Sequence, residues 1–192
     1  MTAFRVIPSF RRAVLFAAFA ALLLPTLPAK EEVLLDFTEV RRDPDKRIYK
    51  CYEYSFGDWG NKKVIDLPGK GALIQAPGGK GGLGENKTLL KLNKFQVLEV
   101  TYIIGNANQA GTINFGVTDK DGTEQSWSIP LAGLAKGADQ RFRFDLTKPS
   151  AEPKPGKTPG LDLAHLDSWQ VRGDWGAAKV EVLVVRISGI KK

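Results

Sequence analysis

The chain has 192 residues, of which 28 are basic, 21 are acidic and one is histidine, so its formal net charge at pH 7 is +7. The basic residues are spread along the chain without a block of Lys or Arg, which argues against a nucleic-acid-binding protein. With one histidine and one cysteine, the common zinc sites and any intramolecular disulfide are excluded.

The first 29 residues have the pattern of a cleavable signal peptide. Residues 1–12 carry three arginines and no acidic residue, and residues 13–24 form an apolar run. Pro25 ends this run, and Ala29 is a small residue of the kind that precedes signal-peptidase cleavage. A membrane-spanning helix needs about 20 apolar residues, so no integral membrane anchor is expected. We therefore expect a secreted or periplasmic protein.

Residues 30–192 are expected to fold as one domain. Removal of the signal peptide takes away three basic residues and no acidic residue, which lowers the net charge to +4. A chain of about 160 residues can bury roughly 70% of its unfolded surface in one core, so no covalent crosslink is needed. Cys51 lies in a strand-like run, and we expect this free cysteine to be buried and inert.

The mature chain shows short alternating or apolar runs between clusters of Gly, Pro, Asn and Asp, and hardly any helical periodicity. This pattern is typical of a β-sandwich or β-barrel. Strands are predicted at residues 33–37, 47–54, 63–66, 72–75, 89–92, 96–104, 112–118, 124–129, 140–145, 169–172 and 180–190. The fold class predicted from them is all-β, a two-sheet antiparallel β-sandwich of the jelly-roll type.

Two connections carry clear signals. Asp121-Gly122 supplies the positive φ angles of a tight turn, which predicts that strands 112–118 and 124–129 form a hairpin. Residues 148–160 contain four prolines, too many for a strand or helix, so they are expected to form a long surface loop within the domain. At 161–166 a helix of about one turn is conceivable.

Three motifs resemble sites of known chemistry, and each has a simpler interpretation. Gly79–Gly84 spells Gly-x-Gly-x-x-Gly, but no helix is predicted after it, so we expect a flexible loop between strands and no dinucleotide site. Asp119-Lys-Asp-Gly resembles the start of a calcium loop, but Pro130 stands where the bidentate glutamate would be, so a hairpin turn is expected. His165 has no Gly-x-Ser-x-Gly serine to serve and is expected to be structural.

The tetrapeptide Gly-Asp-Trp-Gly occurs twice, at residues 57–60 and 173–176. Each copy is expected to form a turn at the end of a strand with a tryptophan at the rim of the sandwich. Trp59 and Trp175 would then either cover the core or contact a ligand, because an indole can be half buried with one edge exposed.

Residues 98–127 and 169–187 carry a family resemblance. The first stretch contains Asp119-Lys-Asp-Gly-Thr123 followed by an aromatic strand, and the second contains a late Trp and Gly strand followed by an apolar closing strand. This order resembles the galactose-binding-like β-sandwich (jelly roll) of bacterial carbohydrate-binding modules. The resemblance covers most of residues 33–190.

The resemblance implies glycan binding on the concave face of one sheet or at loops on its rim. Carried over to this chain, it gives outward polar positions of the central strands as ligand-binding candidates: Thr101, Asn114, Ser126, Arg143, Gln170 and Arg172. The two rim tryptophans, Trp59 and Trp175, join them. Many such modules also hold a structural calcium ion, for which Asp36 is a candidate ligand, although the last strand lacks an acidic partner.

The function expected from these observations is an exported, non-catalytic domain that binds a carbohydrate or an envelope glycan. A structural or protein-interaction module of the cell envelope is the alternative, with another envelope protein as its partner. A glycoside-active enzyme is a third possibility, because such an enzyme needs only two suitably spaced carboxylates. The carboxylates available for it are Glu53, Glu99, Glu124 and Asp145.

Overall fold

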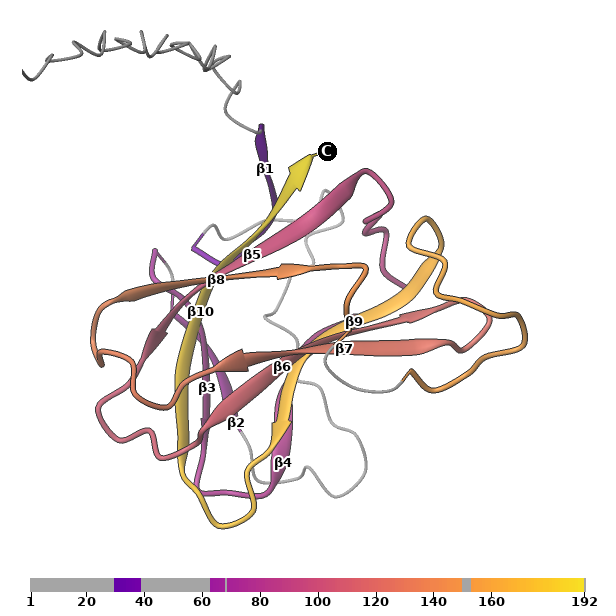
Figure 1. Ribbon diagram of the computed structural model, residues 1–192. Coiled ribbons are helices and arrows are strands. Elements are labelled where there is room, and N and C mark those ends of the chain that lie inside the picture. The colour runs from indigo at the N-terminus through magenta and orange to yellow at the C-terminus, as the bar shows by residue number, and fades with distance from the viewer. Residues whose placement is uncertain (1–29, 39–62, 68, 150–152, 192) are drawn as a thin grey trace, which may run out of the picture.

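The computed structural model describes residues 30–38, 63–67, 69–149 and 153–191. This part of the chain contains ten strands and no helix, and the strands form two antiparallel sheets (Figure 1). This confirms the predicted all-β sandwich. The strands are β1 (Glu31–Asp36), β2 (Lys63–Leu67), β3 (Gly71–Ala76), β4 (Lys80–Asn86), β5 (Phe95–Ile104), β6 (Thr112–Asp119), β7 (Glu124–Pro130), β8 (Asp139–Asp145), β9 (Leu166–Asp174) and β10 (Val180–Lys191).

The larger sheet is organised around the long strand β10. One side of β10 pairs with β5, and the other side pairs with two strands in succession. β3 pairs with Val180 to Val184, and β1 pairs with Arg186 to Ile190. β2 extends the sheet beyond β3, and β8 extends it beyond β5. β10 is therefore paired along both edges, in agreement with its nearly continuous apolar sequence.

The smaller sheet has four strands in the order β4-β9-β6-β7. β6 and β7 form the predicted hairpin, and Gly122 in its turn has a φ angle of 97°, in the region that glycine favours. β9 comes from much later in the chain and lies between β4 and β6. Because side chains alternate along a strand, each strand here has one face toward the larger sheet and one face outward.

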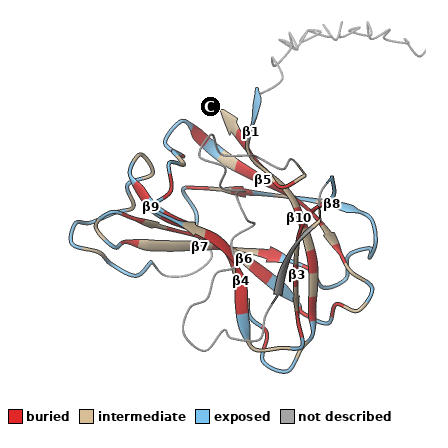
Figure 2. Cartoon of the chain, turned by 180° about the vertical axis from the view of Figure 1, so that it is seen from behind, coloured by how far each residue is buried: buried red, intermediate tan, exposed pale blue. Residues whose placement is uncertain are grey.

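Aromatic side chains join the two sheets. The ring of Phe144 in β8 lies 5.7 Å from that of Phe115 in β6 and 5.4 Å from that of Trp127 in β7, measured between centroids. The hydroxyl of Tyr102 in β5 donates to the carbonyl of Pro130 at 2.8 Å. Figure 2 shows buried residues concentrated on the strands and exposed residues on the connecting loops. The sandwich is therefore stabilised mainly by the apolar surface buried between its sheets.

One predicted strand is wrong. Residues 89–92 are not in a strand, because backbone hydrogen bonds join this segment to the start of β9 and to the chain before it only near its ends. The N–H of Thr88 donates to the carbonyl of Asp167 at 3.0 Å, and the N–H of Leu92 donates to that of Leu163 at 2.8 Å. Nine other predicted strands coincide with strands of the structure, and residues 47–54, with Cys51, lie outside the described residues.

The expected flexible glycine loop at residues 79–84 is also wrong, because most of it forms strand β4. The glycines allow β4 to approach β9 closely. A Cβ on Gly84 would overlap the carbonyl oxygen of Trp169 and would lie 3.0 Å from Cγ of Gln170. A Cβ on Gly82 would likewise overlap the backbone of β9. Glycine here reflects the approach of a neighbouring strand.

The Asp119-Lys-Asp-Gly motif is a hairpin turn, as predicted. The buried carboxylate of Asp119 accepts hydrogen bonds from the backbone N–H groups of Asp121 at 3.1 Å, Thr123 at 2.9 Å and Asp162 at 2.9 Å. The carboxylate of Asp121 accepts from the N–H of Thr158 at 2.8 Å and from its hydroxyl. The two carboxylates therefore join the hairpin to the proline-rich segment and to the chain before β9.

The proline-rich segment contains no strand in its described residues, which are mostly exposed. Its one ladder contact is an isolated bridge between Lys154 and Glu124 at the start of β7. Residues 161–165 contain a turn at 163–164 and no helix, and β9 begins at Leu166. In the described residues, this connection therefore contains no helix and no strand apart from the isolated bridge.

The spacing between β4 and β9 gives a test of the fold. We expect Gly84→Ala to destabilise the protein by about 1–3 kcal/mol, because its methyl group overlaps the backbone of β9. Gly116→Ala in β6 is the matched control, since its Cβ would meet no heavy atom closer than 3.6 Å. Its free energy of unfolding should change by less than about 1 kcal/mol. Denaturant unfolding of both variants measures the difference, and equal effects would contradict the close approach.

Candidate functional site

The outward residues of the four-stranded sheet form a polar, glycine-rich surface, called here the outer face. The strand register arranges them in three rows across β4, β9, β6 and β7. The rows are Gly82, Arg172, Asn114 and Ser128; Gly84, Gln170, Gly116 and Ser126; and Asn86, Ser168, Thr118 and Glu124. The outer face thus brings together four of the predicted ligand-binding residues: Asn114, Ser126, Gln170 and Arg172.

An ion pair crosses this surface. The side chain of Arg172 in β9 passes over Gly116, where a Cβ would lie 3.9 Å from its Nε, and its Nη2 donates to Oε1 of Glu124 in β7. The other carboxylate oxygen of Glu124 accepts from Nζ of Lys154 at 3.1 Å. Only 27% of the Arg172 side chain and 20% of the Glu124 side chain are exposed, so water screens the pair only partly.

The electrostatics of Glu124 follow from these contacts. Burial by itself would raise the pKa of the carboxyl group, because it disfavours the charged form. The hydrogen bond from Lys154 and the charge of Arg172 outweigh the burial, so the pKa of Glu124 lies below its usual value of 4.5. Glu124 is therefore held as an anion between two cations.

Gln170 lies at the centre of the outer face and is nearly completely buried. Its side chain lies toward β4, with Cγ 3.0 Å from the position that a Cβ on Gly84 would occupy. Its Oε1 is buried and accepts no hydrogen bond from the residues that the structure describes. Burial of an amide oxygen without a hydrogen-bond donor destabilises a protein by about 1–3 kcal/mol. A donor from a ligand would remove this cost.

Thr101 and Arg143 lie on the opposite side of the sandwich. They belong to β5 and β8, where they point outward from the six-stranded sheet. Nε of Arg143 donates to Oε2 of the buried Glu99 at 2.6 Å, and Nη1 of Arg141 lies 3.7 Å from Oε1 of the same carboxylate. The structure therefore divides the predicted ligand-binding residues between two faces.

The described tryptophans are core residues. Trp175 is only 8% exposed, and its indole N–H donates to the carbonyl of Thr112 at 3.0 Å. Of the two roles left open for Trp175, the structure places it as a lid over the core. Trp127 and Trp169 are also buried. Trp59 lies outside the described residues, and its contact with a ligand stays a prediction.

Asp36 closes a local turn at the end of β1. Its Oδ1 accepts from the N–H of Thr38 at 2.9 Å and from the hydroxyl of Thr38 at 2.6 Å. Within the described ranges there is no group of three or more His, Cys, Asp or Glu side chains that could hold a metal ion. The described residues likewise include no helix long and apolar enough to cross a membrane.

The carboxylates considered for glycoside chemistry are held apart or engaged. Glu124 lies on the outer face, whereas Glu99 lies on the opposite side of the sandwich. Asp145 accepts from the N–H of Thr147 at 2.8 Å and from its hydroxyl at 2.6 Å, which lowers the pKa of Asp145. Glu53 lies outside the described residues. Glu124 and Glu99 therefore do not face each other across one cleft.

The two-sheet sandwich is similar to solved structures of carbohydrate-binding modules. A family 11 carbohydrate-binding module from Clostridium thermocellum, solved with a β-1,3-1,4-mixed-linked tetrasaccharide, matches 68% of this chain and 82% of its own, with a TM-score of 0.51 and 15% identity. The solution structure of CtCBM11 matches 87% of this chain and 98% of its own, with a TM-score of 0.55 and 15% identity. The chain has the jelly-roll fold of the carbohydrate-binding modules. The resemblance expected from the sequence is confirmed at this level.

The same jelly roll also occurs as part of larger proteins. The agarase AgWH50C matches 83% of this chain but only 24% of its own length, with a TM-score of 0.55 and 13% identity. No family model matches the sequence, and no curated protein matches it. The likeness to solved structures therefore establishes the fold of the jelly roll, and the ligand has to be argued from the residues of the outer face.

The ion pair on the outer face predicts a pH dependence. The folded-state pKa of Glu124 is below 4.5, so its contribution to stability is fully present above about pH 4.5 and is lost as the pH falls through the folded-state pKa. Glu124→Gln should therefore lose less stability than the wild type on acidification. Denaturant unfolding between about pH 6 and pH 3 measures this difference.

A double-mutant cycle isolates the pair. In an Arg172→Gln background, the effect of Glu124→Gln at neutral pH should shrink, with a coupling energy of about 1 kcal/mol. Additive effects of the two substitutions would show that the pair contributes nothing to stability.

Proposed function

We propose that this chain is a carbohydrate-binding domain that holds a glycan on the outer face of its four-stranded sheet. The observation that carries the proposal is the buried, unpaired Oε1 of Gln170 at the centre of that face. The fold is shared with modules of which one was solved with a mixed-linked tetrasaccharide.

The chemistry of the outer face suits a ligand rich in hydroxyl groups. Amide groups of Asn114 and Gln170 and the hydroxyl of Thr118 each offer both a donor and an acceptor. Asn114 and Thr118 are half-buried, and their side chains form no hydrogen bond within the described structure. Neighbouring strands are about 4.8 Å apart, so these groups form a regular array. Oε1 of Gln170 is buried, so a sugar hydroxyl would donate to it after the side chain turns outward.

The glycines keep the outer face flat. Gly82, Gly84 and Gly116 carry no side chain, so the surface between the polar groups is low. The guanidinium of Arg172 is neutralised by Glu124, so no unpaired charge stands at the centre. Binding would rest on hydrogen bonds and would favour a neutral glycan.

The proposal includes export and a role without catalysis. The signal-peptide pattern of the first 29 residues supports a secreted or periplasmic location, where a carbohydrate or an envelope glycan is available. The glycan would be bound and released unchanged, because Glu124 is engaged by two cations and is not free to act as an acid or base.

Affinity gel electrophoresis tests the proposal. We expect one of a panel of neutral polysaccharides, including mixed-linkage β-glucan, agarose and xylan, to retard the chain. Asn114→Ala should weaken the retardation about fivefold, since a lost hydrogen bond is worth about 1 kcal/mol. Thr118→Ala should act in the same direction.

Arg143→Gln is the matched control, because Arg143 lies on the opposite side of the sandwich. It should leave the retardation unchanged, and thermal unfolding should show all three variants to be folded. Loss of binding in Arg143→Gln alone would indicate that the site lies on the six-stranded sheet. The absence of retardation by every polysaccharide would refute the proposal.

A further inference from the structure

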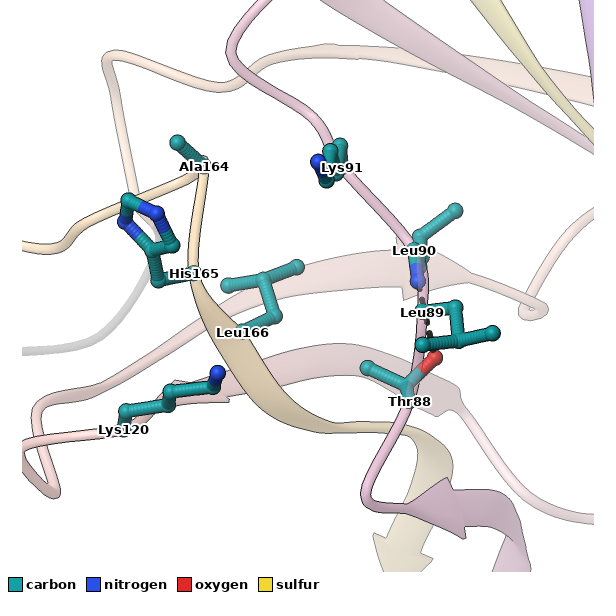
Figure 3. Close-up of a pocket in the computed structure, with 8 residues that line it drawn as sticks. All are labelled: Thr88, Leu89, Leu90, Lys91, Lys120, Ala164, His165 and Leu166. Carbon is teal, nitrogen blue, oxygen red and sulfur yellow. Dashed lines mark hydrogen bonds between the residues drawn. The ribbon is translucent and has the colours of Figure 1, made fainter.

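A pocket of about 450 Å³ lies between the segment that follows β4 and the start of β9 (Figure 3). One wall is the segment between β4 and β5, from Thr88 to Lys91. The other wall is the chain entering β9, from Ala164 to Leu166, with Lys120 of the hairpin turn beside it. Its volume is within the range of small-molecule sites, about 300–1,000 Å³.

The walls are held by hydrogen bonds above and below the pocket. The two segments are joined at Thr88 and Asp167 and again at Leu92 and Leu163. Between these points they form no backbone hydrogen bond with each other in the described structure, and the pocket opens there. The N–H of Lys120 donates to the carbonyl of His165 at 3.0 Å, which attaches the hairpin turn to the second wall. The pocket is therefore built into the connections.

The lining is apolar with a positive rim. Leu89, Leu90 and Leu166 supply apolar surface, and Leu89 is 90% exposed, the largest exposure among the described large hydrophobic residues. The titratable residues of the lining are Lys91, Lys120 and His165, and the lining includes no Asp or Glu. Neither lysine forms an ion pair with a described carboxylate.

Of the carboxylates near the lining, those of Asp162 and Glu85 are already engaged, and the exposed Asp167 follows Leu166 outside the lining. The carboxylate of Asp162 accepts from the N–H of Ala164 at 2.9 Å, and its Oδ2 lies 2.7 Å from Nδ1 of His165, which fixes the imidazole. Glu85 accepts from the hydroxyl of Thr88 at 2.7 Å and from the indole N–H of Trp169 at 2.9 Å. The two lysine ammonium groups are therefore left as the unpaired charges of the pocket.

We propose that this pocket is a second binding site, for a small organic anion with an apolar body, such as an aromatic carboxylate. The ring would cover the exposed side chain of Leu89, removing its apolar surface from water, and the carboxylate would lie between Lys91 and Lys120. A neutral sugar fits less well, because the only hydroxyl of the lining, that of Thr88, already donates to Glu85. This site does not depend on glycan binding by the outer face.

The single histidine gives a direct reporter. His165 is the only histidine of the chain and lines the pocket, so its imidazole Cε1 proton gives a unique NMR signal. At fixed pH and low salt, titration with 3-phenylpropionate should shift this signal with saturation. The amide 3-phenylpropanamide should shift this signal far less, because it lacks the charge. Acetate should also shift it far less, because it lacks the ring.

Matched lysine variants separate this site from general attraction to a basic protein. Lys91→Gln and Lys120→Gln should each weaken binding of 3-phenylpropionate about twofold to fivefold, as expected for an exposed ion pair. Lys70→Gln, outside the pocket, should leave it unchanged. No saturable shift of the His165 signal, equal binding of the acid and the amide, or equal weakening by all three variants would overturn the proposal. A shift caused by a neutral oligosaccharide alone would assign the pocket to the glycan instead.

Discussion

The outer face depends on one packing constraint, that the long polar side chains of β9 lie flat over glycines of the neighbouring strands. Gln170 lies toward Gly84 on one side, and Arg172 crosses Gly116 on the other. A Cβ on Gly84 would lie 3.0 Å from Cγ of Gln170, so a larger residue there would force this side chain away from the sheet. The arrangement leaves Oε1 of Gln170 buried without a donor, a cost of about 1–3 kcal/mol that a ligand hydroxyl would remove.

The ion pair of Arg172 and Glu124 extends this arrangement to the connections. Glu124 also binds Lys154 of the proline-rich segment, both through its side chain and through the isolated bridge. A half-buried pair gains little net stability, because desolvation offsets much of the attraction between the charges. Its structural effect is positional: it fixes the direction of the Arg172 side chain and keeps the proline-rich segment at the edge of β7.

The sequence predicted the sheets well, and the site only in part. Alternation in 112–118 and the Asp-Gly turn identified the hairpin, because both signals are local. Asn114 and Arg143 were grouped as outward positions, but period-two alternation does not say in which sheet a strand lies. The same limit hid the partnership of Glu124 with Arg172, which requires the insertion of β9 beside β6. The glycines of β4 do not indicate a strand from the sequence, because the reason for them is a strand more than 80 residues away along the chain.

The carboxylates of Asp119 and Asp121 link the two proposed sites. They fasten the turn between β6 and β7 to the chain before β9, and hydrogen bonds from Thr158 and Thr123 hold the pKa of Asp121 far below its usual range. This network holds Lys120 beside the pocket, and at the same time sets where β7 begins on the outer face. A carboxylate that accepts several backbone N–H groups stays ionised into acid. The geometry of both sites is therefore maintained by the same turn, although their ligands differ in chemistry.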